Sequence, residues 1–226
     1  MDVNDILFLD FETDTTGTFF CATHRLGNVF EQVILNEGLR PLAQAKGLRV
    51  LSPKAFISEI MDLVRNSILA AYTEAELNTI RNLLDEIDHK PQTIKYCNMK
   101  KAAMKYINTD PDRHQKFNDL PPYVLNASDY QQRTMRRSLA SVARMFPVEI
   151  PRAYHPGKTS KRFKDVLKGL HVKNGDYSSL TVTQKTKGTK ALNHNKFDVA
   201  VLPLMFNKIL ADNPKHITRS IKTVTF

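Results

Sequence analysis

The chain reads ILFLDFET at residues 6–13, an apolar run of strand length that carries two acidic residues near its end. Alternate residues of a strand point to the same face, so this run places Asp10 and Glu12 side by side. Two adjacent carboxylates repel each other, and burying them without a partner is costly. A divalent cation with a preference for oxygen ligands, Mg²⁺ or Mn²⁺, compensates such a pair. The alternative is a frayed strand end at which water solvates both carboxylates.

The chain beyond this run predicts a mixed α/β order of elements. Two further strands at 18–23 and 28–35 are spaced as in a hairpin meander. Ser52 and Pro53 are typical of an N-cap and a first helical position, so a helix is expected to begin there. The other expected elements are strands at 67–72 and 93–99, helices from 73, at 100–107, about 129–145, near 163–170 and at 197–210, and a loop at 173–190.

The length of 226 residues suits a single domain, 1–226. Residues 108–160 lose clear periodicity and carry several prolines, which indicates an inserted, partly irregular segment. No run approaches the length of apolar residues that a membrane span needs. An acidic N-terminus without a basic region predicts no signal peptide. With two cysteines, Cys21 and Cys97, the expected compartment is reducing and cytoplasmic.

The charge is distributed unevenly. Residues 1–90 hold 8 Lys/Arg against 14 Asp/Glu, whereas residues 91–190 hold 20 against 7. An acidic first part followed by a strongly basic one favours a polyanionic partner, most often nucleic acid. A solvated basic surface without a partner is the alternative.

Two further acidic positions have ordinary explanations when each is taken alone. Asp198 is expected near the start of the helix at 197–210, where a carboxylate suits the helix dipole, and His194 precedes it by four residues in a loop. Thr73 and Glu76 fit a capping box, in which Glu76 reaches back to the N-cap residue. That role neither requires a metal nor excludes one.

Taken together, these segments resemble the DEDD family of 3′→5′ exonucleases within the ribonuclease-H-like fold. Residues 8–13, FLDFET, are similar to its first motif, a strand that ends in Asp-x-Glu. The strand–helix junction at 68–77, ILAAYTEAEL, resembles the second motif, and HNKFDVAVL at 194–202 resembles the third. The second motif usually has Asp where this chain has Glu76. In the histidine subclass the third motif usually places His five residues before Asp, not four.

The resemblance implies a ribonuclease-H-like mixed five-stranded sheet flanked by helices, with a basic, partly helical insertion. It implies that Asp10, Glu12, Glu76 and Asp198 hold two Mg²⁺ or Mn²⁺ ions. Asp10 would bridge both ions, Glu12 and Asp198 would hold the ion that activates water, and Glu76 would help to hold the second. His194 would be the general base.

The basic middle of the chain is expected to contact backbone phosphates without sequence preference. The candidate contacts in this region are Arg133, Arg136, Arg137, Lys161, Arg162 and Lys190. The predicted function is therefore two-metal 3′→5′ exonucleolytic hydrolysis of DNA or RNA, acting on a single strand or an end and not at a membrane. The alternatives are a non-catalytic nucleic-acid-binding protein on the same fold, and an endonuclease that uses the same site.

Overall fold

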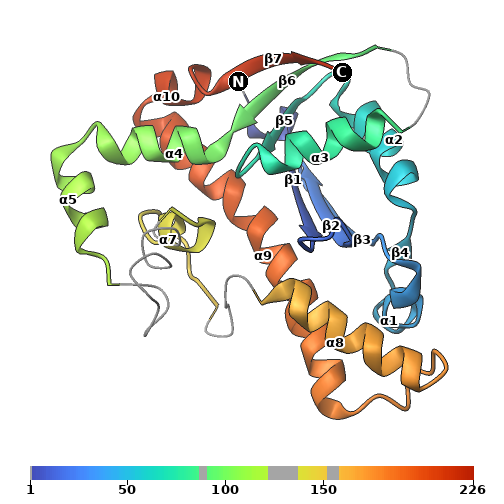
Figure 1. The fold of residues 1–226 in the computed structure, drawn as a ribbon. Coiled ribbons are helices and arrows are strands. Elements are labelled where there is room, and N and C mark those ends of the chain that lie inside the picture. Colours follow the sequence, from blue (N-terminus) through green and yellow to red (C-terminus); the bar gives the residue numbers. More distant parts are fainter. Residues whose placement is uncertain (1, 87–90, 122–136, 152–157) are drawn as a thin grey trace.

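The computed structural model describes residues 2–86, 91–121, 137–151 and 158–226. Its centre is a mixed sheet in the order β4-β3-β2-β1-β5-β6-β7 (Figure 1). Strand β1 (Ile6–Thr13) lies between antiparallel β2 (Phe19–Leu26) and parallel β5 (Ile68–Ala71). The remaining strands are β3 (Val29–Ile34), β4 (Arg49–Val50), β6 (Thr93–Asn98) and β7 (Ile221–Thr225).

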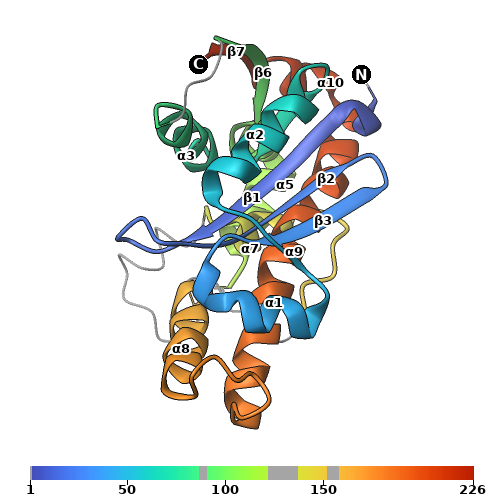
Figure 2. The same ribbon diagram turned by 90° about the vertical axis from the view of Figure 1, so that its right-hand side faces the viewer.

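Helices cover both faces of this sheet, so the prediction of an α/β fold is confirmed (Figures 1 and 2). Short 3₁₀ turns occupy Val3–Asp5 and Glu37–Leu39. The helices are α1 (Arg40–Lys46), α2 (Pro53–Val64), α3 (Ala75–Leu84), α4 (Met99–Asn108), α5 (Pro111–Asp119), α7 (Leu139–Ala143), α8 (Thr159–Val172), α9 (Val182–Asp212) and α10 (Pro214–Thr218).

The alternation of side chains along β1 explains the two main cores. Leu7 and Leu9 face α2 and α3, whereas Ile6 and Phe8 face α4 and α9. A third core joins α1, α8 and the first turns of α9, where the ring of Phe163 stacks on that of Phe20 with centroids 5.4 Å apart. Helix α9 passes from this third core along the face of the sheet that carries Ile6 and Phe8, so it lies against the strand that holds Asp10 and Glu12.

The sheet has seven strands where five are expected from the sequence. The five expected strands are present, and β4 and β7 are added at the two edges. Strand β4 is only two residues long, too short for a periodic signal. Strand β7 pairs antiparallel with β6, from which it is separated by more than 120 residues of chain. Pairing at that separation is a tertiary event that no local pattern predicts.

The expected loop at 173–190 is wrong in its second half. Helix α9 begins at Val182, behind a capping box in which Thr181 and Gln184 exchange hydrogen bonds, and it continues to Asp212. The expected helix at 197–210 is thus the second half of a longer one. Of the helix expected at 129–145, the described part is helical at Leu139–Ala143, and 129–136 lie outside the described residues.

Parts of the expected insertion belong to the core. Phe117, Leu139 and Phe146 pack in the same cluster as residues of β1 and α9. Cys21 and Cys97 are both buried and free of disulfides. In the described ranges, no helix combines the length and the apolar character that crossing a bilayer would need.

Candidate active site

The acidic end of β1 lies against α9. Phe8, Asp10 and Glu12 share one face of the strand because side chains alternate. The ring of Phe8 packs edge-on against that of Phe206 on α9, with centroids 6.1 Å apart. The two carboxylates therefore continue along the α9 side of the sheet, toward the N-terminal half of that helix.

Asn195 of α9, fully buried, holds Asp10 in place. Its Nδ2 donates to Oδ2 of Asp10 at 2.6 Å. Its Oδ1 accepts hydrogen bonds from the Thr23 hydroxyl and from Nε2 of Gln32, the latter at 3.1 Å. These bonds fix which amide atom faces the carboxylate, so Asn195 presents a donor to Asp10. Asparagine is common in turns, so the sequence alone does not distinguish Asn195 as a site residue.

His194 and Asp198 lie one helical turn apart on α9. Nε2 of His194 is 3.4 Å from Oδ2 of Asp198, and the two residues are 7% and 9% exposed. Both residues lie in the interior of a long helix, not at its start. The expected N-terminal position of Asp198 is therefore wrong, and the helix dipole does not account for its placement. The spacing of four residues nevertheless brings the two side chains together, as one turn of 3.6 residues predicts.

Glu12 completes this group from the strand. One ligand atom from each of Glu12, His194 and Asp198 lies within 4.8 Å of the other two. The hydroxyl of Thr159, the first residue of α8, forms a hydrogen bond to Glu12, and the positive charge of Arg162 acts on the same carboxylate. Three elements, β1, α8 and α9, thus meet at this side chain.

Glu76 approaches from the start of α3. Its Oε2 accepts hydrogen bonds from the backbone N–H of Thr73 at 3.3 Å and from the Thr73 hydroxyl at 2.9 Å. The hydrogen bond from the backbone N–H of Thr73 to the Glu76 side chain, which the capping box predicts, is therefore present. The other half differs, because the Thr73 hydroxyl accepts from the N–H of Ala75, and the helix begins at Ala75 with Glu74 as its N-cap.

The charges of the other three expected carboxylates act on Asp10. The pKa of Asp10 is raised well above its usual value by burial, and further by the negative charges of Asp198, Glu12 and Glu76. The pKa of Glu12 is also raised well above its usual value, by burial and then by Asp198. Burial raises the pKa of Glu76. We refer to Asp10, Glu12, Glu76 and Asp198 as the acidic cluster. Mutual repulsion of this kind is relieved either by protonation or by a bound cation.

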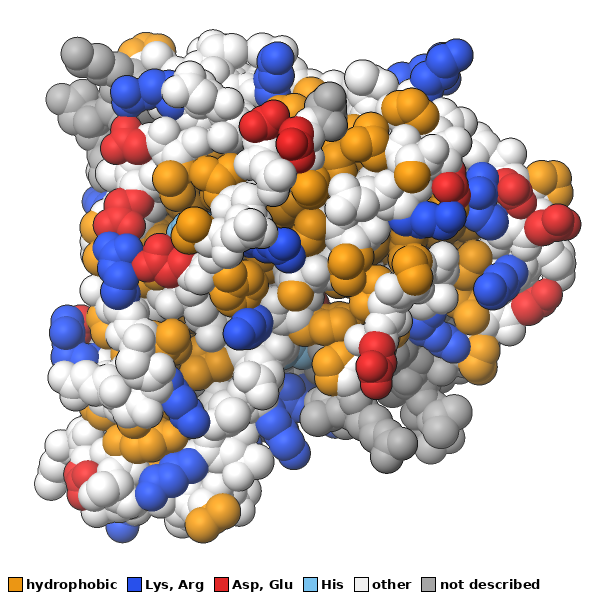
Figure 3. Space-filling model, turned by 180° about the vertical axis from the view of Figure 1, so that it is seen from behind, with side chains coloured by type: hydrophobic (Ala, Val, Ile, Leu, Met, Phe, Trp, Pro, Cys, Tyr) orange, Lys and Arg blue, Asp and Glu red, His pale blue; other side chains and the backbone are white. Residues whose placement is uncertain are grey.

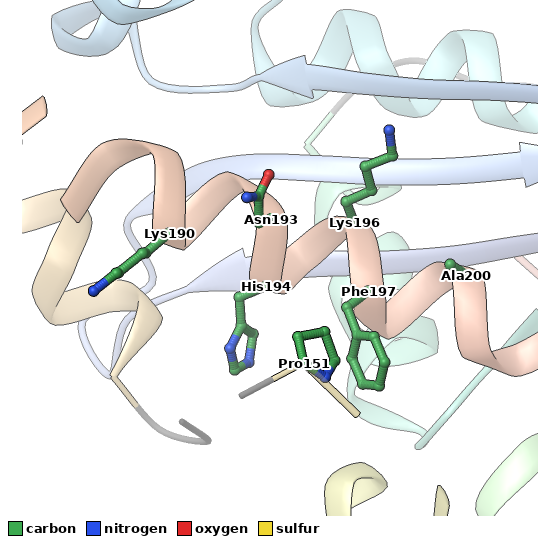
Figure 4. Close-up of a pocket in the computed structure, with 7 residues that line it drawn as sticks. All are labelled: Pro151, Lys190, Asn193, His194, Lys196, Phe197 and Ala200. Carbon is green, nitrogen blue, oxygen red and sulfur yellow. The ribbon is translucent and has the colours of Figure 1, made fainter. Parts of the chain in front are cut away.

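A pocket of about 300 Å³ opens beside His194. Figure 4 shows His194, Phe197 and Pro151 together on one side of α9, with Lys190 extending along the same helix. The pocket therefore combines an apolar wall and an aromatic ring with a cation and the imidazole.

The predicted phosphate contacts are distributed unevenly. Lys161 and Lys190 are exposed on α8 and α9, and Arg137 is exposed in the turn before α7. Arg162 is expected on the basic surface, but it is only 9% exposed, so that expectation is wrong. Arg133 and Arg136 lie outside the described residues.

Three residues that are not among the predicted site residues also belong to the site. Thr159 and Asn195 bond to members of the acidic cluster. Tyr72, at the end of β5, has a pKa raised by burial and by Asp198, and its hydroxyl donates to the carbonyl of Arg137 at 2.8 Å. The one available signal was the position of Tyr72 at a strand–helix junction.

Comparison with known proteins adds no homologue to this picture: no family model, no curated protein and no solved structure matches the chain.

Proposed function

We propose that this protein is a two-metal nuclease that removes nucleotides from the 3′ end of DNA or RNA. The observation that carries the proposal is the acidic cluster: carboxylates from β1, α3 and α9 interact at one end of the sheet, with His194 beside Asp198. Several carboxylates that are partly or fully removed from water and repel one another are typical of a cation site or another functional site.

The order of the elements also supports a ribonuclease-H-like fold. Three antiparallel strands are followed by a helix, a strand, a helix and a strand, and a late helix bears the last acid. The edge strands β4 and β7 and the short helix α1 are additions to that order. This is the arrangement that the resemblance to the DEDD exonucleases implies.

The residues present fit divalent cations. The donors are carboxylate oxygens, which suit Mg²⁺ and Mn²⁺. Burial, and after it the negative charge of neighbouring carboxylates, raises the pKa of Asp10 and of Glu12, and a bound cation would offset both effects. Glu12 and Asp198 would hold one ion, Glu76 would help to hold a second, and Asp10 would contact both. When bound, two such ions stabilise the charge on phosphoryl oxygens and lower the pKa of water.

The side chains around the cluster have separate roles in this proposal. Asn195 orients the Asp10 carboxylate through its 2.6 Å hydrogen bond. Thr159 orients Glu12 in the same way from α8. His194 stands next to Asp198, which orients the imidazole, and a neutral imidazole there accepts a proton from an attacking water. The apolar wall at Phe197 and Pro151 offers a surface for a nucleobase.

The nucleic acid would reach the cluster along a helical hairpin, α8 and the first turns of α9, which we call the basic arm (residues 158–190). The arm holds 9 Lys/Arg against 2 Asp/Glu. It extends away from the sheet in Figures 1 and 2, and several blue side chains lie among white and orange ones at the lower left of Figure 3. Its two ends lie next to Thr159 and His194, so a strand that follows the arm arrives at the site.

Reversing charge on the arm should weaken binding in a salt-dependent way. Lys161, Lys168 and Lys190 are exposed and form no ion pair within the described ranges. Replacing all three by Glu should lower affinity about equally for unrelated sequences. It should also flatten the slope of log K against log salt by about 0.7 for each phosphate of a single strand that the variant no longer neutralises. The same reversal at Arg65 and Lys95, at the opposite end of β5 and β6, is the control. An unchanged slope would place the nucleic acid elsewhere.

The activity itself is tested with purified protein and oligonucleotides of DNA and of RNA, labelled at the 5′ end and incubated with Mg²⁺, Mn²⁺ or EDTA. A ladder that shortens one nucleotide at a time in the presence of metal supports the proposal. Internal cuts in a circular single strand would instead indicate an endonuclease. Binding without any cleavage would indicate the non-catalytic alternative.

Glu76→Gln separates the two roles of Glu76. The amide oxygen of glutamine can still accept from the N–H and the hydroxyl of Thr73, so the melting temperature should change little. The lost negative charge should weaken the second ion, so turnover should fall severalfold or more at limiting Mn²⁺ and recover partly at saturating Mn²⁺. Glu74→Gln is the control, because Glu74 is exposed and pairs with Lys222. Unchanged turnover at limiting metal would leave Glu76 with a capping role only.

A further inference from the structure

Arg162 is the one cation of α8 that is buried. Its side chain lies in the first turns of that helix, and the residue is 9% exposed, whereas Lys161, Lys164 and Lys168 on the same helix are exposed. Its Nη1 is shielded from solvent, and no residue in the described ranges accepts a hydrogen bond from it. One end of the guanidinium group, Nη1, is therefore buried without a hydrogen-bond acceptor.

Such an arrangement is costly in the free protein. Arginine remains charged at any pH that a protein experiences, and it carries five N–H donors. Burying a charged donor without a hydrogen-bond acceptor costs more free energy than burying a neutral donor without one. A structural arginine normally recovers this cost through a carboxylate held in a two-pronged bond or through backbone carbonyls. Arg162 has neither within the described ranges.

The position of Arg162 points to a ligand at the acidic cluster. Thr159 and Arg162 are three residues apart, so they share one face of α8. Both act on Glu12, Thr159 by a hydrogen bond and Arg162 by its charge. The start of α8 also lies against the end of β1, where the Ser160 hydroxyl donates to the carbonyl of Thr13 at 2.7 Å. Arg162 is therefore near the proposed metal site, on the side that the basic arm forms.

An anionic oxygen acceptor would satisfy Nη1 and balance the charge of the guanidinium. A phosphodiester has two non-bridging oxygens with that character, and arginine recognises phosphate through its planar set of donors. The acidic cluster alone would repel such a group, so a fixed positive charge beside it has a clear electrostatic use.

We propose that Arg162 is a catalytic residue that donates a hydrogen bond to one non-bridging oxygen of the phosphodiester that the site holds. The inference rests on the proposed nuclease function and adds a protein-borne cation to the carboxylates and the imidazole. It differs from a positioning role, in which Arg162 would act only by holding Glu12 in its charged form.

Binding probes that lack one oxygen distinguish these roles. The probes are three trinucleotides that differ at the 3′-terminal linkage, which is a phosphodiester or either diastereomer of a methylphosphonate. Affinity is measured by fluorescence anisotropy at fixed salt, with Ca²⁺ in place of Mn²⁺ so that binding is separated from turnover. The variants are Arg162→Gln and Arg162→Lys. Arg65→Gln, which removes an exposed arginine at the far end of the sheet, is the control.

Arg162→Gln should weaken binding of the phosphodiester by about tenfold to a hundredfold, the range for a hydrogen bond to a charged group. For one methylphosphonate diastereomer, the affinities of wild type and Arg162→Gln should agree within about twofold, because that probe lacks the non-bridging oxygen that Arg162 contacts. Arg162→Lys should show a smaller loss with the same dependence, and it serves as the test if the glutamine variant does not fold. Arg65→Gln should match wild type on all three probes.

An equal loss on all three probes would overturn the inference, since the effect would then pass through Glu12 or through stability. So would failure of wild type to bind any probe. The proposed function is assayed separately, by cleavage in Mn²⁺. Cleavage by wild type without the diastereomer dependence would refute only the role of Arg162. If binding depends on the diastereomer but wild type cleaves nothing, the proposed nuclease activity is refuted and Arg162 remains a phosphate-binding residue.

Discussion

Asp10→Asn is expected to lower metal-dependent cleavage of single-stranded oligonucleotides by roughly 10³-fold or more. Asp10 is the member of the acidic cluster that interacts with all three others, and in the proposed site it contacts both ions. Two ions contribute several kcal/mol to stabilising phosphoryl transfer, and each 1.4 kcal/mol is about tenfold in rate. The measurement is the initial rate of shortening with Mn²⁺, together with calorimetric titration of Mn²⁺ into each protein.

The same variant should preserve the fold. The amide oxygen of asparagine can still accept the hydrogen bond from Nδ2 of Asn195, so the contact between β1 and α9 is retained. Asp62→Asn, at an exposed acid of α2, is the matched control for the loss of one charge. If Asp10→Asn cleaves within a few-fold of wild type, the acidic cluster is not a catalytic metal site.

Stability in EDTA provides a second readout on the same pair of proteins. Because the pKa of Asp10 is raised in the folded state, its contribution to stability is fully present at low pH. That contribution is lost as pH rises through the raised pKa. Without metal, wild type should therefore lose stability relative to Asp10→Asn between about pH 4 and the raised pKa. Adding Mn²⁺ should reverse the difference by stabilising wild type alone. Parallel pH profiles in EDTA would mean that neither burial nor the neighbouring carboxylates disfavour the charged form of Asp10.

Much of the sheet and the pair of acids on β1 are predictable because they depend on local patterns. The alternation in ILFLDFET places Asp10 and Glu12 on one face whatever the rest of the chain does. Ser52 and Pro53 start α2 where the sequence indicates, with the Ser52 hydroxyl oxygen accepting from the N–H of Ala55 at 3.1 Å. Glu76 and Asp198 could be joined to that pair only by resemblance, because residues from three separate elements share no local signal.

The errors arise where tertiary contacts decide. The first turns of α9 contain Thr, Lys and Gly, so few large apolar residues mark their buried side and periodicity is weak there. Gly188 shows the constraint directly: a Cβ at this position would meet a methyl group of Leu42 at 3.2 Å. Counting charges likewise treats Arg162 as a surface cation, although the fold buries it near Glu12. Burial of a single side chain is not encoded in composition.

His194 has two possible roles at the site, and they predict different losses. As the general base it would take a proton from water, whereas as a ligand it would hold an ion together with Glu12 and Asp198, since ligand atoms of all three lie within 4.8 Å of one another. His194→Ala should lower turnover by roughly 10²–10⁴-fold if the imidazole is a positioned base. Mn²⁺ affinity should then remain near that of wild type, because the carboxylates persist.

The decisive measurement pairs turnover with Mn²⁺ affinity in His194→Ala. Turnover that falls together with affinity, and recovers at saturating Mn²⁺, would assign His194 as a ligand. Turnover that falls at every Mn²⁺ concentration with affinity unchanged assigns it as the base. The acidic limb of the pH–rate profile should then change as well, because only the neutral imidazole accepts a proton. That limb alone does not decide, since metal-bound water also titrates near neutrality. Turnover within a few-fold of wild type would remove His194 from the reaction, and Asp198 would then be the only member of the α9 pair with a part in it.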